Sequence, residues 1–238
     1  MDDAVSRLDV PGTSNFRAVA PGTVASGRLY RSDALHRLTN SGRRRIAELG
    51  ITDVIDLRSG IDRRIGGRDR LRGTGAVRIS LPIDGVPRRV DLTTITLLEV
   101  YRVILSRHQQ LLGTVIRAIA ASDGPVLVHC TAGKDRTGLV IALTLAAIGV
   151  DRDVILDDYA LTAANLAGPW TERMVRKARR FRIRLTDDLI AILASSPREV
   201  LSETLEWIDA EFGGLTEYLD GAGVDADVRA ALHTKLLP

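Results

Sequence analysis

Short apolar runs separated by glycine and proline dominate the first half of the chain, and this pattern is typical of strands and turns. Residues 8–32 predict short strands and turns, with Pro-Gly and Ser-Gly pairs between them. Three longer apolar or alternating runs predict further strands, over residues 51–57, 77–81 and 125–129. The Gly- and Arg-rich residues 59–75 predict a loop or a short helix between two of these strands.

Helical spacing of apolar residues appears between and after the predicted strands. Thr39 is a candidate N-cap for a helix over residues 41–49 that stops at Gly50. Residues 91–121 predict two helices, or one helix broken near Gly113. Residues 137–148 predict a buried helix that is closed by a glycine.

The C-terminal third predicts amphipathic helices alone. Ser196-Pro197-Arg198-Glu199 has the form of a capping box with proline at the first helical position, and the helix is expected to run to about Phe212 and end at Gly213. Asp225 is expected to cap the last helix. Strands that alternate with helices, followed by helices alone, predict an α/β fold in which a mainly parallel sheet is flanked by helices. We expect a single domain over residues 1–238.

One short loop carries the chemistry of the chain. Residues 129–138 read His-Cys-Thr-Ala-Gly-Lys-Asp-Arg-Thr-Gly, so the only cysteine, Cys130, stands six positions before Arg136. A predicted strand precedes the loop and a predicted helix follows it. Successive backbone N–H groups and the positive end of the helix dipole then point to one place. Such a nest stabilises a thiolate and can receive the oxygens of a phosphate.

Each residue of this loop has a predicted role. Cys130 attacks phosphorus to form a cysteinyl-phosphate, and the planar fork of Arg136 binds two phosphate oxygens. Thr137 donates its hydroxyl to the sulfur, and His129 orders the loop through hydrogen bonds. The remaining substrate contacts are expected from Thr131, Ala132, Gly133 and Lys134.

Other interpretations of the loop fit less well. A structural cysteine has no use for three charged residues around one thiol. A Walker-type nucleotide loop fails because Gly133-Lys134 is followed by Asp135 instead of Ser or Thr. A catalytically weak module that binds phosphotyrosine or phosphoinositide is the remaining alternative, and the presence of both Cys130 and Arg136 argues against it.

The Gly-Lys-Asp-Arg-Thr form of the loop resembles the bacterial tyrosine phosphatases. The resemblance runs from about residue 8 to the C-terminus and includes Asn15-Phe16-Arg17, Tyr30-Arg31-Ser32, Asp56-Leu57-Arg58 and Asp158-Tyr159. It implies a cysteine-phosphatase-like fold and hydrolysis of phosphotyrosine through a cysteinyl-phosphate. In members with this Lys-Asp pair it also implies activity on phosphoserine, phosphothreonine and phosphoinositides.

The general acid that protonates the leaving group has two candidates. The chain contains no Trp-Pro-Asp sequence, which supplies this acid in many tyrosine phosphatases. The resemblance points to Asp135, in the loop, or Asp84, in a Pro/Gly segment, and Asp135 is the first choice because it lies beside the reacting phosphate. Lys134 is expected to bind a second phosphate or a substrate carboxylate, or to support the dianion electrostatically.

Composition limits the remaining functions. A net charge of +3 without an aromatic platform argues against nucleic-acid binding. One cysteine and four scattered histidines predict no metal site, and we expect no cofactor. The longest apolar stretch, residues 139–148, is much shorter than the roughly 20 residues of a membrane span. The acidic N-terminus is no signal peptide, which predicts a cytoplasmic protein. The resemblance leaves export without a signal peptide open.

Residues 165–200 are candidate lid helices, since the resemblance places a lid over the active site in this part of the chain. Seven basic residues lie between Arg173 and Arg184. They predict either a helix that attracts phosphoinositide headgroups or an anionic membrane surface, or an ordinary solvated helix face.

Overall fold

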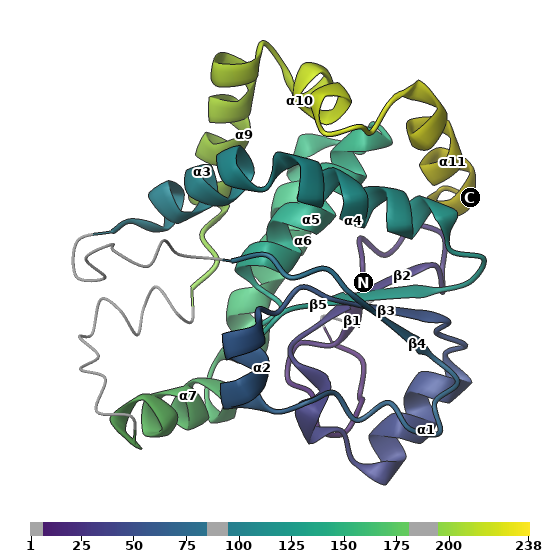
Figure 1. Ribbon diagram of the computed structural model, residues 1–238, viewed down its shortest axis with the longest axis vertical. Coiled ribbons are helices and arrows are strands. Elements are labelled where there is room, and N and C mark those ends of the chain that lie inside the picture. Colours follow the sequence, from purple (N-terminus) through teal and green to yellow (C-terminus); the bar gives the residue numbers. More distant parts are fainter. Residues whose placement is uncertain (1–6, 85–94, 181–194) are drawn as a thin grey trace.

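A mainly parallel five-stranded sheet lies at the centre of the computed structural model, which describes residues 7–84, 95–180 and 195–238 (Figure 1). The strand order is β1-β2-β5-β3-β4. β1 pairs antiparallel with β2, and every other pair is parallel. The strands are β1 (Arg17–Ala18), β2 (Leu29–Ser32), β3 (Asp53–Asp56), β4 (Val77–Ser80) and β5 (Val126–His129). The predicted fold class is confirmed.

Alternating side chains of the central strands form two cores on opposite faces of the sheet. In β5, Val126 and Val128 pack into the larger core, whereas Leu127 packs into the smaller one. In β3, Ile55 and Val54 divide in the same way. All four residues of β5 are buried. The strand that leads to the cysteine is therefore fixed from both faces.

Helices cover both faces of the sheet (Figure 1). The larger core takes buried side chains from α3, α4, α5, α6, α9, α10 and α11, and the smaller core takes Ile46 from α1. The helices are α1 (Asn40–Glu48), α2 (Gly60–Gly66), α3 (Leu97–Arg107), α4 (Gln109–Ala121), α5 (Asp135–Ala147), α6 (Arg152–Leu166), α7 (Pro169–Arg180), α9 (Arg198–Phe212), α10 (Leu215–Gly221) and α11 (Ala226–Leu236), with a 3-10 helix η1 at Leu35–Arg37.

Three predicted helix ends are confirmed. The Thr39 hydroxyl accepts a hydrogen bond from the Gly42 amide at 3.1 Å, and the Asp225 carboxylate accepts one from the Val228 amide at 3.0 Å. Gly213 ends α9 in the left-handed conformation, with a φ of 83°. Local side-chain caps and a glycine therefore decide where these helices begin and end.

The break in the helical residues 91–121 lies at His108, and not at Gly113. Two helices, α3 and α4, meet at His108, while residues 91–94 lie outside the described part of the chain. Gly113 is inside α4, where the backbone passes so close to α10 that a Cβ would lie 1.8 Å from the Ala222 carbonyl oxygen. The glycine therefore permits a close helix contact instead of a break.

The predicted capping box at residues 196–199 is wrong. The residue before α9 is Pro197, and no side chain caps this helix. The Ser196 hydroxyl binds α6 instead: it accepts from the Ala163 amide at 2.9 Å and donates to the Ala160 carbonyl at 3.0 Å. Tertiary packing has taken the hydroxyl that the local sequence would have used as a cap.

The lid and single-domain expectations stay predictions. Within residues 165–200 the structure describes α7 and residues 195–200, and the predicted lid and basic residues at 181–194 lie outside the described residues. In the part of the chain that is described, no helix is both long and apolar enough to cross a membrane. The two predicted compartments, cytoplasmic and exported, remain sequence-based expectations.

Substitution of Gly113 by alanine tests the α4–α10 contact. We expect Gly113→Ala to lower the free energy of unfolding by about 1–3 kcal/mol, because the added methyl group collides with backbone. Gly60→Ala is the matched control, since a Cβ at Gly60 meets nothing within 4 Å. Urea unfolding of both variants measures the difference. Equal stabilities would show that α4 and α10 can separate without cost.

Candidate active site

Parallel strands place the predicted catalytic loop at their carboxyl ends. His129 closes β5 and lies in register with Ser32 of β2 and Asp56 of β3. Cys130 follows directly and is 2% exposed. The helix α5 begins at Asp135, two residues before the predicted start at residue 137, so Asp135 and Arg136 belong to its first turn. Ligand sites of open α/β sheets lie at this edge.

The carbonyl oxygens of the loop are bound from behind. The Asn15 side-chain amide donates to the carbonyls of Ala132 and Gly133 at 3.0 and 3.2 Å. The Arg31 guanidinium donates to the Gly133 carbonyl at 2.9 Å. The backbone amide of Ala34 donates to the Thr131 carbonyl at 3.2 Å. These hydrogen bonds orient the peptide groups so that their N–H groups face the opposite side of the loop, which we call its front.

The amide groups on the front of the loop are unoccupied by the described part of the protein. No acceptor among the described residues takes a hydrogen bond from the amides of Thr131, Ala132 or Gly133. Gly133 has a φ of 67°, and a Cβ there would lie 2.2 Å from the Ser32 carbonyl oxygen, so only glycine fits. The predicted nest of N–H groups therefore has the geometry that an anion requires.

A buried cluster of charges from β1, β2 and α6 supports the hydrogen bond between Arg31 and the loop. Arg31, Arg17 and Asp158 are all buried, and Asp158 accepts from Arg31 and lies 3.8 Å from Arg17. Arg17 also donates to the Asp158 carbonyl and to the Thr162 hydroxyl, both at 2.8 Å. Burial and the adjacent Arg31 charge lower the pKa of Arg17 to about 9. These charges hold Arg31 where it can bind the loop.

Arg136 lies in front of the loop and contacts three segments. Its Nη1 donates to Asp62 at 2.6 Å and to the Ile83 carbonyl at 3.2 Å, and its Nη2 donates to the Thr131 hydroxyl at 3.4 Å. Burial alone would lower the pKa of Arg136, but the negative charges of Cys130 and Asp62 outweigh it and raise the pKa. Arg136 therefore stays charged beside the sulfur.

Asp62 is a site residue that the sequence reasoning missed. It accepts from the Ser59 amide at 3.0 Å in a capping box at the start of α2, and also pairs with Arg136. Burial would raise the pKa of Asp62, but Arg136 overrides this effect and lowers the pKa. The Ser59-x-x-Asp62 spacing is a sequence signal for the cap, whereas the ion pair joins residues 74 positions apart.

Asp135 is fixed by buried neighbours. Its Oδ1 accepts from the Tyr101 hydroxyl at 2.8 Å and lies 2.9 Å from the Lys134 ammonium group. Tyr159 lies 2.6 Å from Tyr101, hydroxyl to hydroxyl. The Asp135 side chain is 31% exposed. It is therefore held firmly at one oxygen while it remains accessible to solvent.

The Lys134 side chain is buried against protein groups. It is 2% exposed, and its Nζ donates to the Ser195 carbonyl at 3.0 Å in addition to the Asp135 contact. The expected contact of Lys134 with substrate stays a prediction. Asp84, the second candidate acid, is exposed and follows Ile83, whose carbonyl accepts from Arg136. The backbone just before Asp84 therefore lies beside Arg136.

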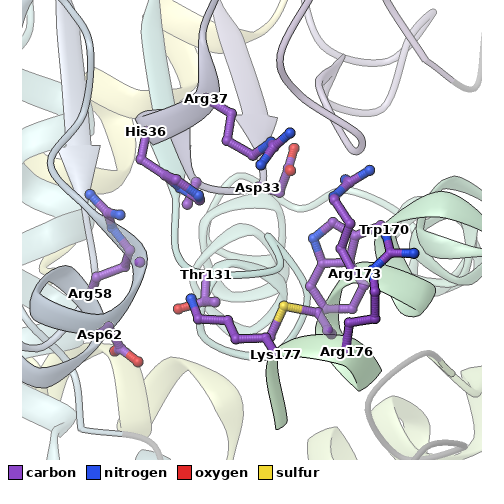
Figure 2. Close-up of a pocket in the computed structure, with 13 residues that line it drawn as sticks. Asp33, His36, Arg37, Arg58, Asp62, Thr131, Trp170, Arg173, Arg176 and Lys177 are labelled. Carbon is purple, nitrogen blue, oxygen red and sulfur yellow. The ribbon is translucent and has the colours of Figure 1, made fainter. Parts of the chain in front are cut away.

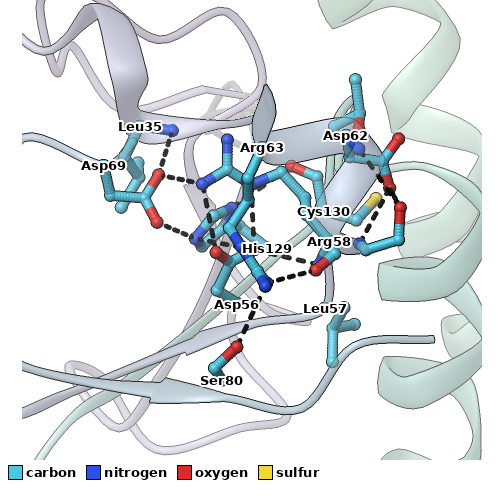
Figure 3. A network of polar contacts seen from close by, with 12 residues as sticks. Leu35, Asp56, Leu57, Arg58, Asp62, Arg63, Asp69, Ser80, His129 and Cys130 are labelled. Atoms are coloured by element: carbon cyan, nitrogen blue, oxygen red, sulfur yellow. Dashed lines mark hydrogen bonds and ion pairs between the residues drawn. The ribbon is translucent and has the colours of Figure 1, made fainter. Parts of the chain in front are cut away.

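A network of charges surrounds His129, the residue that precedes Cys130 (Figure 3). His129 Nδ1 is 3.2 Å from the Cys130 carbonyl oxygen, and His129 Nε2 is 3.3 Å from Asp69 Oδ2. Arg58 donates to Asp56 at 2.9 Å and to Asp69 at 2.7 Å. Burial would raise the pKa of Asp56, but the Arg58 hydrogen bonds and the His129 charge outweigh it and hold the pKa well below its usual range.

Asp56, Asp69 and His129 are also the one group in the described residues that could offer ligand atoms to a metal, all within 4.8 Å of one another. Guanidinium groups already occupy this place, since Arg58 bridges the two carboxylates and Arg78 donates to Asp56 at 2.9 Å. A cation would have to displace them. The expected absence of a metal stays a prediction.

Thr137 and a cavity complete the site. The Thr137 hydroxyl is buried and has no hydrogen-bond partner within the described residues, so it is available to a ligand or to the sulfur. Beside Thr131 a cavity of about 410 Å³ opens between α2, η1 and α7 (Figure 2). Asp62 borders it, which connects the cavity to Arg136.

Comparison with known proteins identifies the family of this site. The sequence model of the tyrosine phosphatase family matches residues 8–238. The chain belongs to the tyrosine phosphatase family. The predicted family, and with it the assignment as a cysteine-dependent phosphatase, is confirmed.

Individual relatives agree with this membership. The phosphatase is 34% identical to the triple specificity protein phosphatase PtpB of Mycobacterium tuberculosis, over 91% of this chain and 94% of that protein. It is 29% identical to a putative tyrosine-protein phosphatase of Cupriavidus necator, over 86% of this chain and 77% of that protein. A tyrosine-protein phosphatase of Nostoc commune is 35% identical over 61% of this chain and 51% of that protein.

The substitution Asp56→Asn tests the charge network that Asp56 forms with Arg58, Asp69 and His129 in the phosphatase. We expect the free energy of unfolding to fall by about 3 kcal/mol near neutral pH, because Arg58 loses one of its two buried counter-charges and keeps only Asp69. The pKa of Asp56 is lowered by folding, so the wild-type advantage is present above the unfolded pKa of about 3.9 and is lost as the pH falls through the folded pKa. Urea unfolding of both proteins over a pH series measures the gap.

Asp53→Asn, at the opposite end of β3, is the control for this experiment. The Asp53 carboxylate accepts hydroxyl hydrogen bonds from Thr52 and Ser122 and forms no ion pair with a described residue. We expect a loss of about 1 kcal/mol. Equal losses for the two variants, or a gap at Asp56 that widens on acidification, would contradict the charge network.

Tyr101→Phe tests the support of Asp135. Tyr101 donates to the carboxylate, so Tyr159 donates to Tyr101, and the substitution removes one donor from Asp135 and leaves the Tyr159 hydroxyl without its acceptor. We expect a loss of about 1–3 kcal/mol in the free energy of unfolding. Tyr159→Phe leaves the Tyr101–Asp135 bond in place and should cost less. Urea unfolding of the two variants is the measurement, and the reverse order would refute this direction of donation.

Proposed function

We propose that this tyrosine phosphatase hydrolyses phosphotyrosine through a cysteinyl-phosphate at Cys130. The observation that carries this mechanism is the orientation of the loop: its carbonyl oxygens are bound by Asn15 and Arg31, while the amides of residues 131–133 donate to no described acceptor. A dianionic phosphate can therefore bind without displacing a protein acceptor, and the cysteine lies at the start of that nest.

In the first step the Cys130 thiolate attacks phosphorus from one side, and the bond from phosphorus to the leaving oxygen breaks on the other. The leaving oxygen takes a proton from Asp135, and Arg136 binds two equatorial oxygens whose charge grows in the transition state. In the second step water attacks phosphorus and gives a proton back to Asp135. The sulfur leaves as a thiolate and accepts a hydrogen bond from the Thr137 hydroxyl, which has no described partner.

Asp135 is our choice for the general acid. Tyr101 and Lys134 hold one carboxylate oxygen, and the side chain is 31% exposed, so the other oxygen can exchange protons with a leaving group or with water. Asp62 is close to Arg136 but is a poor acid, because that ion pair lowers its pKa and keeps it ionised. Asp84 remains the alternative, since the chain enters the site at Ile83.

We further propose that the phosphatase accepts phosphoserine, phosphothreonine and phosphoinositides. The relative from Mycobacterium tuberculosis is described as a triple specificity phosphatase, which supports such breadth. Contact with an anionic membrane surface is part of this proposal. It is supported by the basic residues of α7 and by Ile61 and Ile65 of α2, whose side chains are 61% and 48% exposed.

Turnover by wild type and Cys130→Ser tests the mechanism. The substrates are a phosphotyrosine peptide, a phosphothreonine peptide and phosphatidylinositol phosphates, assayed without added metal. We expect the serine variant to lose all turnover while it still binds phosphotyrosine peptide, because the nest and Arg136 are intact. Wild-type binding without turnover would instead support a module that only recognises phosphate.

Comparison of Asp135→Asn and Asp84→Asn identifies the acid. We expect Asp135→Asn to lower kcat by about 10²–10⁴-fold on a phosphotyrosine peptide. The loss should be much smaller on an aryl phosphate whose leaving group is acidic, because that group needs no proton. Such a leaving-group dependence in Asp84→Asn, and its absence in Asp135→Asn, would transfer the role to Asp84.

A further inference from the structure

The cavity beside Thr131 is lined by cations on facing elements. Figure 2 shows Arg58 and Asp62 on one side and the α7 side chains Trp170, Arg173, Arg176 and Lys177 on the other. His36 and Arg37 of η1 complete the wall, and Thr131 of the catalytic loop borders the same space. A ligand bound in the catalytic loop therefore reaches directly into this cavity.

Positive charge in the cavity exceeds the negative charge available to it. Within the described residues, Arg37, Arg173, Arg176 and Lys177 form no ion pair, and Arg173 donates only to the Ser14 hydroxyl at 2.9 Å. The two acids on the wall are engaged elsewhere. Asp62 pairs with Arg136 at 2.6 Å. Asp33 accepts from the Ser14 and Asn15 amides at 2.8 and 2.9 Å.

The pKa shifts of the lining residues agree with this imbalance. Burial and the nearby Arg37 charge lower the pKa of Arg173 against the opposing charge of Asp33, and burial lowers the pKa of Lys177 against the opposing charge of Asp62. Burial, with the charges of Arg58, Lys177 and Arg37, lowers the pKa of His36 to about 4. Neighbouring cations thus disfavour the charged forms of Arg173 and His36, and an anion bound in the cavity would relieve that repulsion.

We propose that Arg37, Arg173 and Lys177 bind a second phosphate group of the substrate while the catalytic loop binds the first. The substrate class is a small ring with two phosphates, such as an inositol bisphosphate, either free or as a lipid headgroup. A cavity of about 410 Å³ has the size of a small-ligand site, and its cations face one another across it. This proposal rests on the proposed function, since it uses the same catalytic loop.

An ordinary solvated helix face does not explain the placement of these side chains. Arg173 and Lys177 are one helical turn apart, both are partly buried, and both line the cavity. Arg179 and Arg180 are exposed and do not line it. The basic residues of α7 therefore divide into three that line the cavity, Arg173, Arg176 and Lys177, and two that do not, and Arg179 supplies a matched control.

The test is the ratio of kcat/KM for inositol bisphosphates to kcat/KM for the matched monophosphate. Free inositol phosphates, short-chain water-soluble lipids, lipids in anionic vesicles and doubly phosphorylated peptides are all assayed, so that the sources of the second phosphate are distinguished. We expect the double variant Arg173→Gln, Lys177→Met to reduce this ratio by about tenfold or more, and Arg179→Gln to leave it unchanged. The conservative variant Arg173→Lys keeps the positive charge and should therefore reduce the ratio less than the double variant does. Equal thermal midpoints of all variants show that the fold is intact.

Three outcomes would overturn the proposal. An unchanged ratio in the double variant, with monophosphate still hydrolysed, refutes the second phosphate site and leaves the proposed function standing. A loss confined to lipids in anionic vesicles assigns the same side chains to membrane contact instead. A larger loss on doubly phosphorylated peptides than on inositol bisphosphates would show that the ligand of this site is a peptide and not an inositol phosphate. If wild type hydrolyses no monophosphate at all, the proposed function itself fails.

Discussion

The structure depends on how the carbonyl oxygens of one loop are satisfied. A loop that points several N–H groups at one place must turn its carbonyl groups away, and aligned peptide dipoles repel one another unless each carbonyl finds a donor. Asn15 and Arg31 supply these donors from more than 100 positions away in the chain. β1 and β2, which carry or adjoin them, are thus required by the loop as much as by the sheet.

Two clusters of buried charge lie on either side of β5. Arg17, Arg31 and Asp158 form the first, and the second is built around Arg58, Asp56 and Asp69. Removing such groups from water is unfavourable, and apolar side chains of equal volume would often stabilise a fold better. Their benefit here is geometric, because the first cluster holds Arg31 in its hydrogen bond to the loop and the second holds Asp69 close to the preceding histidine, His129.

Local patterns in the sequence predicted most of the fold and the centre of the site. Cys130 and Arg136 are separated by one loop, so spacing alone indicates their common target, and the alternating runs of β3 and β5 predict buried strands. Asp62 was missed because its partner Arg136 is distant in sequence. Gly113 and Ser196 were misread because α10 and α6 decide their roles, and no local rule contains those neighbours.

The stretches of sequence that resemble the family are scattered along the chain, and they contain residues that support the site. Asn15, Arg31, Asp56 and Asp158 all belong to these stretches, and all four bind the loop or the residues that hold it. The sequence stretches that resemble the family therefore include residues whose hydrogen bonds and ion pairs hold the site in place. The direction of Lys134, towards Asp135 and the Ser195 carbonyl, is a tertiary fact that its position in the motif did not indicate.

The lone cysteine gives the protein a property beyond its reaction. Since Cys130 is the only thiol in 238 residues, any thiol-selective reagent that modifies the native chain does so at the proposed nucleophile. A spectroscopic label, a mass tag or a crosslinker attached in this way reports on one known atom, without background and without mutagenesis. The number of thiols that react cannot exceed one per chain, so any higher stoichiometry reports modification of another type of side chain.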